Sequence, residues 1–276
     1  MSSLGWIPYF LRTSPMFMPL SRVSQGFEHL HGWPDISVLE RLRNSATVKP
    51  MTYSGKLVHF VPQSAAPQEF SQQYEPRIYL SGEVQTRPNN WHDLFNALVW
   101  LTFPRAKAAL NRLHYQALLQ EYGNDKKQRG TLRDAATLFD ESGVVVVSSD
   151  AGLSNLLQDF EWKQLFWKQR KAVCNHMRFS LFGHGLYEKS LKPYVGMTGK
   201  GAVLSVEQDF FNQPLAVQLA MIDSMLEDLL SSGKVENFTL SPVPLLGYPG
   251  WSEDNLNDSY YADSHYFRSR PIHVTV

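Results

Sequence analysis

The stretch that decides the fold is NNWHDLFNALVWLTFPRAKAALNRLHYQALLQEY, residues 89–122, because it carries the strongest helical pattern in the chain. Asn89 or Asn90 can cap a helix that runs to about Phe103, with apolar residues recurring at helical spacing. Pro104 ends or kinks this helix, since proline lacks a backbone donor and clashes with the preceding turn. A second helix is predicted over 105–122. Two successive helices therefore form the centre of the predicted fold.

The elements predicted on either side of this pair are shorter and mixed. Asp35 can cap an earlier helix, and Pro214 opens a long amphipathic one with leucine and isoleucine side chains spaced three and four apart. Branched and aromatic runs predict strands, Asp and Gly predict a turn at 140–143, and 131–139 fits either a helix or a strand. Further helices are expected over 153–175 and 183–191, and strands at 56–61, 77–80, 144–147, 179–182 and 202–206.

These elements predict an α+β, helix-dominated single domain with a few short strands, spanning residues 1–276. Residues 1–30 are expected to form an irregular N-terminal arm, because three prolines interrupt their apolar and aromatic side chains. Residues 241–276 are expected to be a loop-rich C-terminal tail packed on the body. A chain of this length can bury enough surface to fold without disulfides or a structural metal.

Composition restricts the classes of function. Lys+Arg and Asp+Glu number 26 each, which argues against a broad electrostatic grip on nucleic acid or an anionic membrane. Cys174 is the single cysteine and cannot form an internal disulfide, so a reducing, cytoplasmic location is expected. No stretch approaches the roughly 20 apolar residues of a membrane span, so no membrane association is expected.

Several common sequence signatures are absent. The chain contains no Gly-x-Gly-x-x-Gly, no Gly-Lys-Ser phosphate loop, no Gly-x-Ser-x-Gly elbow and no Cys-x-x-Cys pair. We therefore expect no nucleotide cofactor, no serine-hydrolase chemistry and no cysteine-bound zinc.

Polar residues gather in short clusters between Trp91 and Lys189. The first cluster lies at the start of the first central helix, where His92 and Asp93 are candidate catalytic groups. The second begins the next helix, where cations are unfavourable unless an anion binds beside them. Its candidate substrate-binding residues are Arg105, Lys107, Asn111 and His114, and Arg133 is a further candidate.

Two other clusters suggest catalysis or metal binding. Asp140 and Glu141 are adjacent carboxylates that can ligate a divalent cation. His184 and Glu188 are four residues apart on a predicted helix, so both can reach one metal or one proton, and both are candidate catalytic groups. The candidate metal ligands are thus Asp140, Glu141, His92 and His184. Glycines on either side of His184 would allow a ligand to approach the backbone closely.

Together these motifs resemble an uncharacterised bacterial family, domain of unknown function 3025. The resemblance rests on NWHDLFNALVW (90–100), FPRAK (103–107), Asn111 with His114, and the segments 133–143, 183–189 and 246–251. It covers roughly residues 30–270 and implies one domain of bacterial origin. It implies no activity and no catalytic residues.

Three functions remain open from the sequence. The first is a hydrolase that uses Zn, Mn or Mg and acts on a phosphate ester or similar anion, because such an ion lowers the pKa of a bound water. The second is a metal-free enzyme in which His92 or His184 is the general base. The third is a protein that binds RNA, a ribonucleoprotein or another protein through aromatic and basic residues: Trp162, Phe166, Trp167, Lys168, Arg170 and Lys171. The sequence does not predict the oligomeric state.

Overall fold

The central stretch forms α3 (Trp91–Thr102) and α4 (Pro104–Tyr122), separated only by Phe103. The Asn90 side chain caps α3 by accepting a hydrogen bond of 3.0 Å from the backbone N–H of Asp93. Pro104 occupies the first position of α4, where its missing N–H has no intrahelical partner to lose. This computed structural model describes residues 4–64, 66–67, 69–122, 130–231 and 240–270, with only the backbone given for 122 and 130–133.

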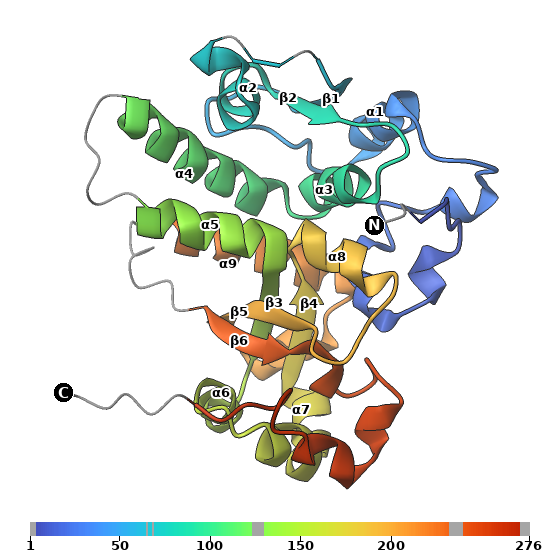
Figure 1. Cartoon of the computed structure of the whole chain (residues 1–276), viewed down its shortest axis with the longest axis vertical. Coiled ribbons are helices and arrows are strands. Elements are labelled where there is room, and N and C mark those ends of the chain that lie inside the picture. The colour runs from blue at the N-terminus through green and yellow to red at the C-terminus, as the bar shows by residue number, and fades with distance from the viewer. Residues whose placement is uncertain (1–3, 65, 68, 123–129, 232–239, 271–276) are drawn as a thin grey trace.

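A four-stranded sheet lies below these helices in Figure 1, with its strands in the order β4–β3–β5–β6. β3 pairs parallel with β5 and antiparallel with β4, and β6 adds antiparallel to β5. Every residue of β3 is buried, which suits its run of four valines. The strand bounds are β3 (Gly143–Ser148), β4 (Met177–Leu181), β5 (Thr198–Ser205) and β6 (Ser241–Pro244).

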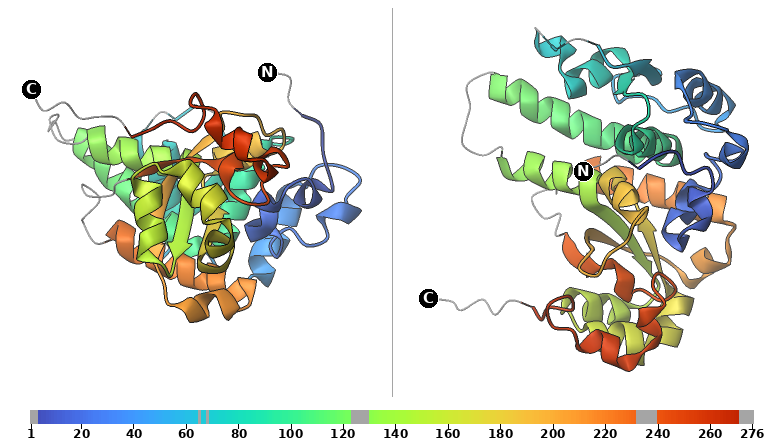
Figure 2. Two further views of the ribbon diagram at one scale, coloured as in Figure 1. Left: turned by 90° about the horizontal axis from the view of Figure 1, so that it is seen from below. Right: turned by 45° about the vertical axis from the view of Figure 1, so that its right-hand side comes forward.

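Helices surround the sheet. α5 packs beside α4, and α9 crosses behind them, as the two orientations in Figures 1 and 2 show. A second group of helices, α6, η5 and α7, connects β3 to β4 and lies at the end of the sheet away from α3 and α4. The bounds are α5 (Gly130–Ser142), α6 (Ala151–Gln158), the π-helix η5 (Gln164–Lys168), α7 (Arg170–His176), α8 (His184–Ser190), η6 (Gln208–Asn212) and α9 (Leu215–Ser231).

The N-terminal region forms the other end of the molecule. A small parallel sheet of β1 (His59–Pro62) and β2 (Glu83–Thr86) lies against α1 (Ile36–Ser45) and α2 (Tyr74–Ser81). Short 3-10 helices precede them: η1 (Phe10–Arg12), η2 (Pro15–Leu20) and η3 (Phe27–His29), with η4 (Phe70–Gln72) before α2. Phe10, Phe17 and Leu20 are fully buried, so this segment belongs to the hydrophobic core.

The C-terminal region contributes both a strand and aromatic packing. β6 is its first element and forms an edge of the sheet, and 3-10 helices follow: η8 (Leu245–Gly247), η9 (Asp254–Leu256) and η10 (Asp258–Ala262). Trp251, Tyr261, Tyr266 and Phe267 are almost entirely buried. Tyr266 binds this segment to the sheet region, because its hydroxyl donates to the carbonyl of Met197 at 2.8 Å.

The predicted fold class is confirmed: the chain is a helix-dominated α+β domain with a few short strands. Three local predictions need correction or resolution. Residues 77–80 lie in α2 and not in a strand, and 131–139 are helical within α5. The turn predicted at 140–143 does not exist as such, because α5 continues to Ser142 and Gly143 starts β3 directly. Among the described residues, no helix has the length and apolarity needed to cross a membrane.

Candidate functional site

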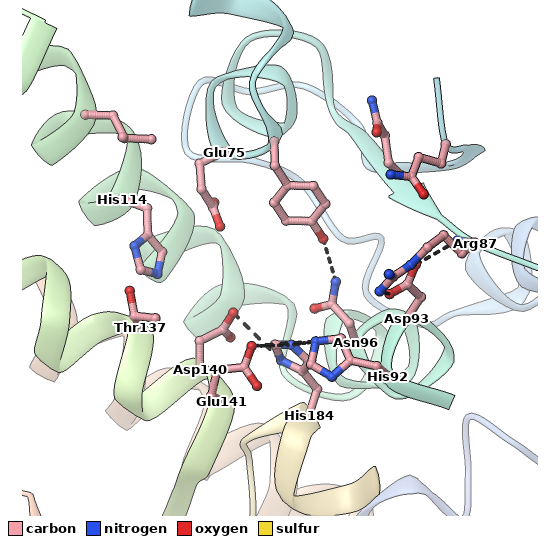
Figure 3. Close-up of a pocket in the computed structure, with 14 residues that line it drawn as sticks. Glu75, Arg87, His92, Asp93, Asn96, His114, Thr137, Asp140, Glu141 and His184 are labelled. Carbon is pink, nitrogen blue, oxygen red and sulfur yellow. Dashed lines mark hydrogen bonds and ion pairs between the residues drawn. The ribbon is translucent and has the colours of Figure 1, made fainter. Parts of the chain in front are cut away.

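Three helix ends bring a triad of potential ligands together. His92 is the second residue of α3, Glu141 lies in the last turn of α5, and His184 is the first residue of α8. α8 packs against both α3 and α5, which fixes the three side chains relative to one another (Figure 3). Residues that are 43 or more positions apart in the sequence therefore meet at one point.

The ligand atoms of this triad form a small triangle. The two histidine Nε2 atoms are 3.0 Å apart. Glu141 Oε1 lies 3.6 Å from Nε2 of His92 and 3.4 Å from Nε2 of His184. The imidazole rings meet edge to face at 73° with their centroids 4.4 Å apart. All three atoms thus point into one space and not at separate neighbours.

The size of this triangle matches a tetrahedral metal site. Zinc binds histidine nitrogen and carboxylate oxygen at about 2.0–2.2 Å, and tetrahedral angles then separate the ligands by about 3.3–3.6 Å. The three observed separations are 3.0, 3.4 and 3.6 Å. A point about 2 Å from all three atoms therefore exists without movement of any side chain. In the described part of the chain, no fourth His, Cys, Asp or Glu joins this group of potential ligands.

A carboxylate faces the second nitrogen of each histidine. Glu188 Oε2 lies 3.1 Å from Nδ1 of His92, within hydrogen-bond distance, and a carboxylate at this place favours the tautomer that carries its proton on Nδ1. Asp140 Oδ2 lies 3.8 Å from Nδ1 of His184, beyond hydrogen-bond distance. His184 Nδ1 is buried without a partner in the described part of the chain. Carboxylates behind metal-bound histidines orient the ring and select its tautomer.

Asp140 is itself held by a buried cation. Lys107 Nζ lies 2.6 Å from Asp140 Oδ1, and the two side chains are 5% and 14% exposed. Burial opposes ionisation of Asp140, but the charges of Lys107, His184 and His114 outweigh it and lower its pKa to about 2. The hydrogen bond with His184 lowers the pKa of Glu141 against the opposing effect of its burial. Both carboxylates are therefore charged at neutral pH.

The triad lies at the wall of a pocket of about 350 Å³. α2 contributes Tyr74 and Glu75 to this pocket, and α4 contributes His114. Figure 3 shows Glu75 and His114 on these two helices. The pocket is also lined by Asn96, which lies one helical turn after His92, and by Arg87, which follows β2. The wall is mostly polar, and it combines side chains from elements that lie far apart in the sequence.

Arg87 and Asp93 form an ion pair at one side of the pocket. Asp93 Oδ1 and Oδ2 accept from the Arg87 guanidinium at 2.7 and 2.9 Å, and Oδ2 also accepts from the Arg87 backbone N–H at 2.7 Å. The predicted catalytic residue Asp93 therefore lies in the pocket wall, and both of its carboxylate oxygens accept hydrogen bonds from Arg87. The hydrogen bonds of the Asp93 carboxylate thus go to Arg87 and not to the triad.

Other predicted residues are distributed unevenly. His92, Glu141 and His184 converge, while Glu188 and Asp140 lie behind the two histidines. His114 lines the pocket, Lys107 is buried against Asp140, and Asn111 is buried against Glu75. Arg105 lies apart from the cluster, because its guanidinium faces Ser224 of α9 at 3.4 Å. The Arg133 side chain is outside the described part of the structure.

The glycines beside His184 have a different role from the one expected. A Cβ on Gly183 would come within 2.6 Å of the Glu141 backbone, and one on Gly185 within 2.5 Å of Glu141 Oε2. These glycines therefore let the end of α5 approach α8 closely, and this close approach places Glu141 beside His184. Sequence reasoning does not single out three other residues of the pocket wall: Tyr74, Glu75 and Arg87. Their segment has no helical periodicity, and its local pattern contains no motif associated with a known chemistry.

Part of the aromatic and basic run after residue 161 is buried in the domain. Trp162 and Phe166 are 4% and 0% exposed, and Trp162 donates to the carbonyl of Arg268 at 2.7 Å. Arg170 donates to the backbone carbonyl and side-chain oxygen of Asn255 at 2.9 and 3.0 Å. These side chains fasten the C-terminal region to the domain.

Fold and site together define an α+β protein with a histidine–glutamate cluster at the meeting point of three helices. The chain belongs to the family described as protein of unknown function (DUF3025), whose family model matches residues 58–271. The match contains every residue of the triad, which lies between positions 92 and 184. No curated protein and no solved structure shows a significant similarity to the chain.

Proposed function

We propose that this protein is a metal-dependent hydrolase whose divalent ion is held by His92, Glu141 and His184. The observation that carries the proposal is the convergence of two Nε2 atoms and one carboxylate oxygen at separations of 3.0 to 3.6 Å. Two neutral imidazoles protonated at Nδ1 would direct lone pairs at each other across 3.0 Å. A cation between them turns that repulsion into attraction.

The ligand set favours zinc over magnesium. Two imidazole nitrogens suit zinc, whereas Mg²⁺ prefers oxygen ligands in octahedral geometry. The carboxylate behind His92 supports the same assignment, because zinc-bound histidines typically donate their other N–H to such a group. Glu188 fills that role at 3.1 Å from Nδ1 of His92.

The open fourth position supports catalysis more than a structural role. Structural zinc sites are usually closed by four protein ligands, whereas catalytic sites keep three protein ligands and one position for water. A divalent ion held by these three residues would lower the pKa of water to about 7 and so make a nucleophile available at neutral pH. The polar pocket of about 350 Å³ gives a small substrate access to the triad.

Metal analysis tests the proposal directly. Protein purified without chelators and without metal-affinity resin is expected to contain one zinc per chain, and zinc is expected to raise the Tm of the chelated protein. His92→Ala and His184→Ala are expected to lose the metal. His29→Ala is the matched control, because that side chain is 82% exposed outside the site. A wild-type protein that retains no metal, and whose Tm does not change with added zinc, manganese or magnesium, would refute the proposal.

The orienting carboxylate provides a second arm of the same experiment. Glu188→Gln is expected to weaken zinc binding about ten-fold, the lower end of the range for orienting groups, because the Glu188 side chain is 48% exposed. Competition with a chromophoric zinc chelator measures the affinity. Equal affinities in wild type and Glu188→Gln would show that this carboxylate does not orient His92.

A metal-free acid–base site is the second candidate, and the same 3.0 Å contact favours it. One proton shared between Nε2 of His92 and Nε2 of His184 would also remove the repulsion between the two nitrogen lone pairs. Hydrolysis of p-nitrophenyl acetate before and after chelation separates the two functions. Loss of hydrolysis on chelation and recovery with zinc support the metal enzyme, whereas full activity of the metal-free protein supports the histidine pair.

A further inference from the structure

We infer that the pocket accepts a small substrate carrying a primary ammonium group, and that Glu75 binds this group while the bond to be hydrolysed faces the triad. The inference rests on the proposed function and adds the class of substrate. It starts from the charges in the pocket wall, which do not balance.

Two basic side chains in the described part of the chain, Arg87 in the pocket wall and Lys107 beside Asp140, are already paired with carboxylates. Arg87 is paired with Asp93 through two hydrogen bonds from its guanidinium, and Lys107 is paired with Asp140 at 2.6 Å. Among the described side chains that line this pocket, Glu75 and Glu141 then remain without a basic partner from Lys or Arg. Glu141 belongs to the triad, so Glu75 is the surplus negative charge.

Glu75 is held in place by a buried amide. Asn111, which is 2% exposed, donates from Nδ2 to Glu75 Oε2 at 2.7 Å and to the Glu75 backbone carbonyl at 3.0 Å. This pair of hydrogen bonds links α4 to the first turn of α2 and fixes the carboxylate. Figure 3 shows Glu75 at the pocket wall. A carboxylate fixed before the ligand arrives loses little conformational entropy on binding.

A second acceptor points at the same space. Asn96 is 6% exposed, and its Nδ2 donates to the Tyr74 hydroxyl at 2.7 Å. Its Oδ1 is buried with no hydrogen-bond partner in the described structure, and Figure 3 shows it directed into the pocket. A buried acceptor without a donor is destabilising, and a donor on the ligand would remove this cost.

An ammonium group matches both features. It has three donors and a positive charge, which suit an acceptor such as the Glu75 carboxylate and a neutral acceptor such as the Asn96 carbonyl. An anionic group at the same position would face two acceptors and find no unpaired lysine or arginine among the described lining residues. The phosphate ester or similar anion expected from the sequence is therefore not the substrate class that we propose.

Hydroxamates that differ only in their charged end test this inference. Glycine hydroxamate and β-alanine hydroxamate place an ammonium at two distances from the metal-binding group, acetohydroxamate is neutral, and succinate monohydroxamate is anionic. Calorimetric titration of the zinc-loaded protein measures each Kd. We expect the better ammonium probe to bind at least about ten-fold more tightly than acetohydroxamate, and the anionic probe to bind more weakly than either.

The variant Glu75→Gln separates this inference from the metal site. Glutamine can still accept from Asn111, so α2 is expected to keep its position. The preference for ammonium should fall to about two-fold or less, while acetohydroxamate binds as in wild type. Glu161→Gln is the matched control, since that residue is exposed and does not line the pocket.

Three results would overturn the inference. One is equal or tighter binding of the anionic probe, and another is an ammonium preference that persists unchanged in Glu75→Gln. Both leave the metal site intact, because acetohydroxamate still binds. Zinc-loaded protein that binds none of the four probes would instead contradict the proposed metal centre, and the substrate inference with it.

Discussion

Lys107→Met removes the cation that holds Asp140 behind His184, and it discriminates between two roles for this lysine. The sequence suggested that Lys107 binds substrate, whereas in the structure its Nζ is 2.6 Å from Asp140 Oδ1 and its side chain is 5% exposed. Methionine keeps most of the packing volume and removes the charge. Asp140 would then be a buried carboxylate without its main partner.

The expected loss of stability follows from two estimates. The pKa of Asp140 is about 2 against an ordinary value of 3.8, and this difference corresponds to about 2 kcal/mol. Removing one partner from a buried ion pair usually costs about 3–5 kcal/mol, because the other charge stays in a poorly solvated place. We therefore expect Lys107→Met to lower the free energy of unfolding by about 2–5 kcal/mol at pH 7.

Urea denaturation of the metal-free protein at pH 7 measures this loss, and a double-mutant cycle identifies its cause. Asp140→Asn removes the charge that Lys107→Met leaves unpaired, so the double variant is expected to recover part of the stability lost in Lys107→Met. Two single losses that simply add in the double variant would refute the ion pair as the source. A Lys107→Met protein as stable as wild type would refute the whole interpretation.

The ion pair also predicts a pH dependence. The folded protein holds the pKa of Asp140 below its unfolded value of 3.8, so its contribution to stability is complete above about pH 4. It is lost as the pH falls from about 4 to about 2. Asp140→Asn should therefore have a flatter stability profile than wild type across this interval.

Two further predictions concern α8 and α9. Gly185→Ala places a Cβ 2.5 Å from Glu141 Oε2, so we expect zinc affinity to fall about ten-fold or more while the domain stays folded. Gly5→Ala is the control, because a Cβ there meets no atom within 4 Å. Unchanged zinc affinity in Gly185→Ala would contradict the triad geometry. Burial raises the pKa of Asp223 to about 6, so its ionisation should reduce stability by at most about 3 kcal/mol as the pH rises from about 4 to 6. Asp223→Asn should make stability less dependent on pH over this range, and asparagine can still accept from the backbone N–H groups of Arg105 and Ala106. The control Asp228→Asn should keep the wild-type dependence. Identical pH profiles of stability in both variants would disprove the assignment of this dependence to Asp223.

The parts of the fold that local chemistry controls were predictable. The caps at Asp35 and Asn90 and the first-position Pro104 set helix starts through side-chain and backbone geometry within a few residues. The valine run of β3 was recognisable because a strand buried on both faces is continuously apolar. The strand prediction for residues 77–80 is wrong, because their branched and aromatic side chains suit either a strand or a helix. These residues are helical, and Gly82 in the left-handed conformation caps the helix.

The candidate site was predictable residue by residue but not as a geometry. The sequence singled out His92, Glu141 and His184 among about a dozen polar candidates, and nothing in the sequence separated them from Arg105, which lies beside α9. Glu75 had no motif at all. Its importance comes from Asn111 on another helix, a contact between residues 36 positions apart.

The sequence by itself determined the helical pair at residues 91–122, the buried strand at 144–147 and the identity of the polar side chains. Periodicity, capping and branching act over a few residues, so these features can be recognised locally. Only the tertiary structure decided which side chains meet, because α8 had to pack against both α3 and α5 through glycines that tolerate close backbone contact. The charge of the pocket is likewise a tertiary property, since Arg87 and Lys107 are neutralised by carboxylates that folding brings to them.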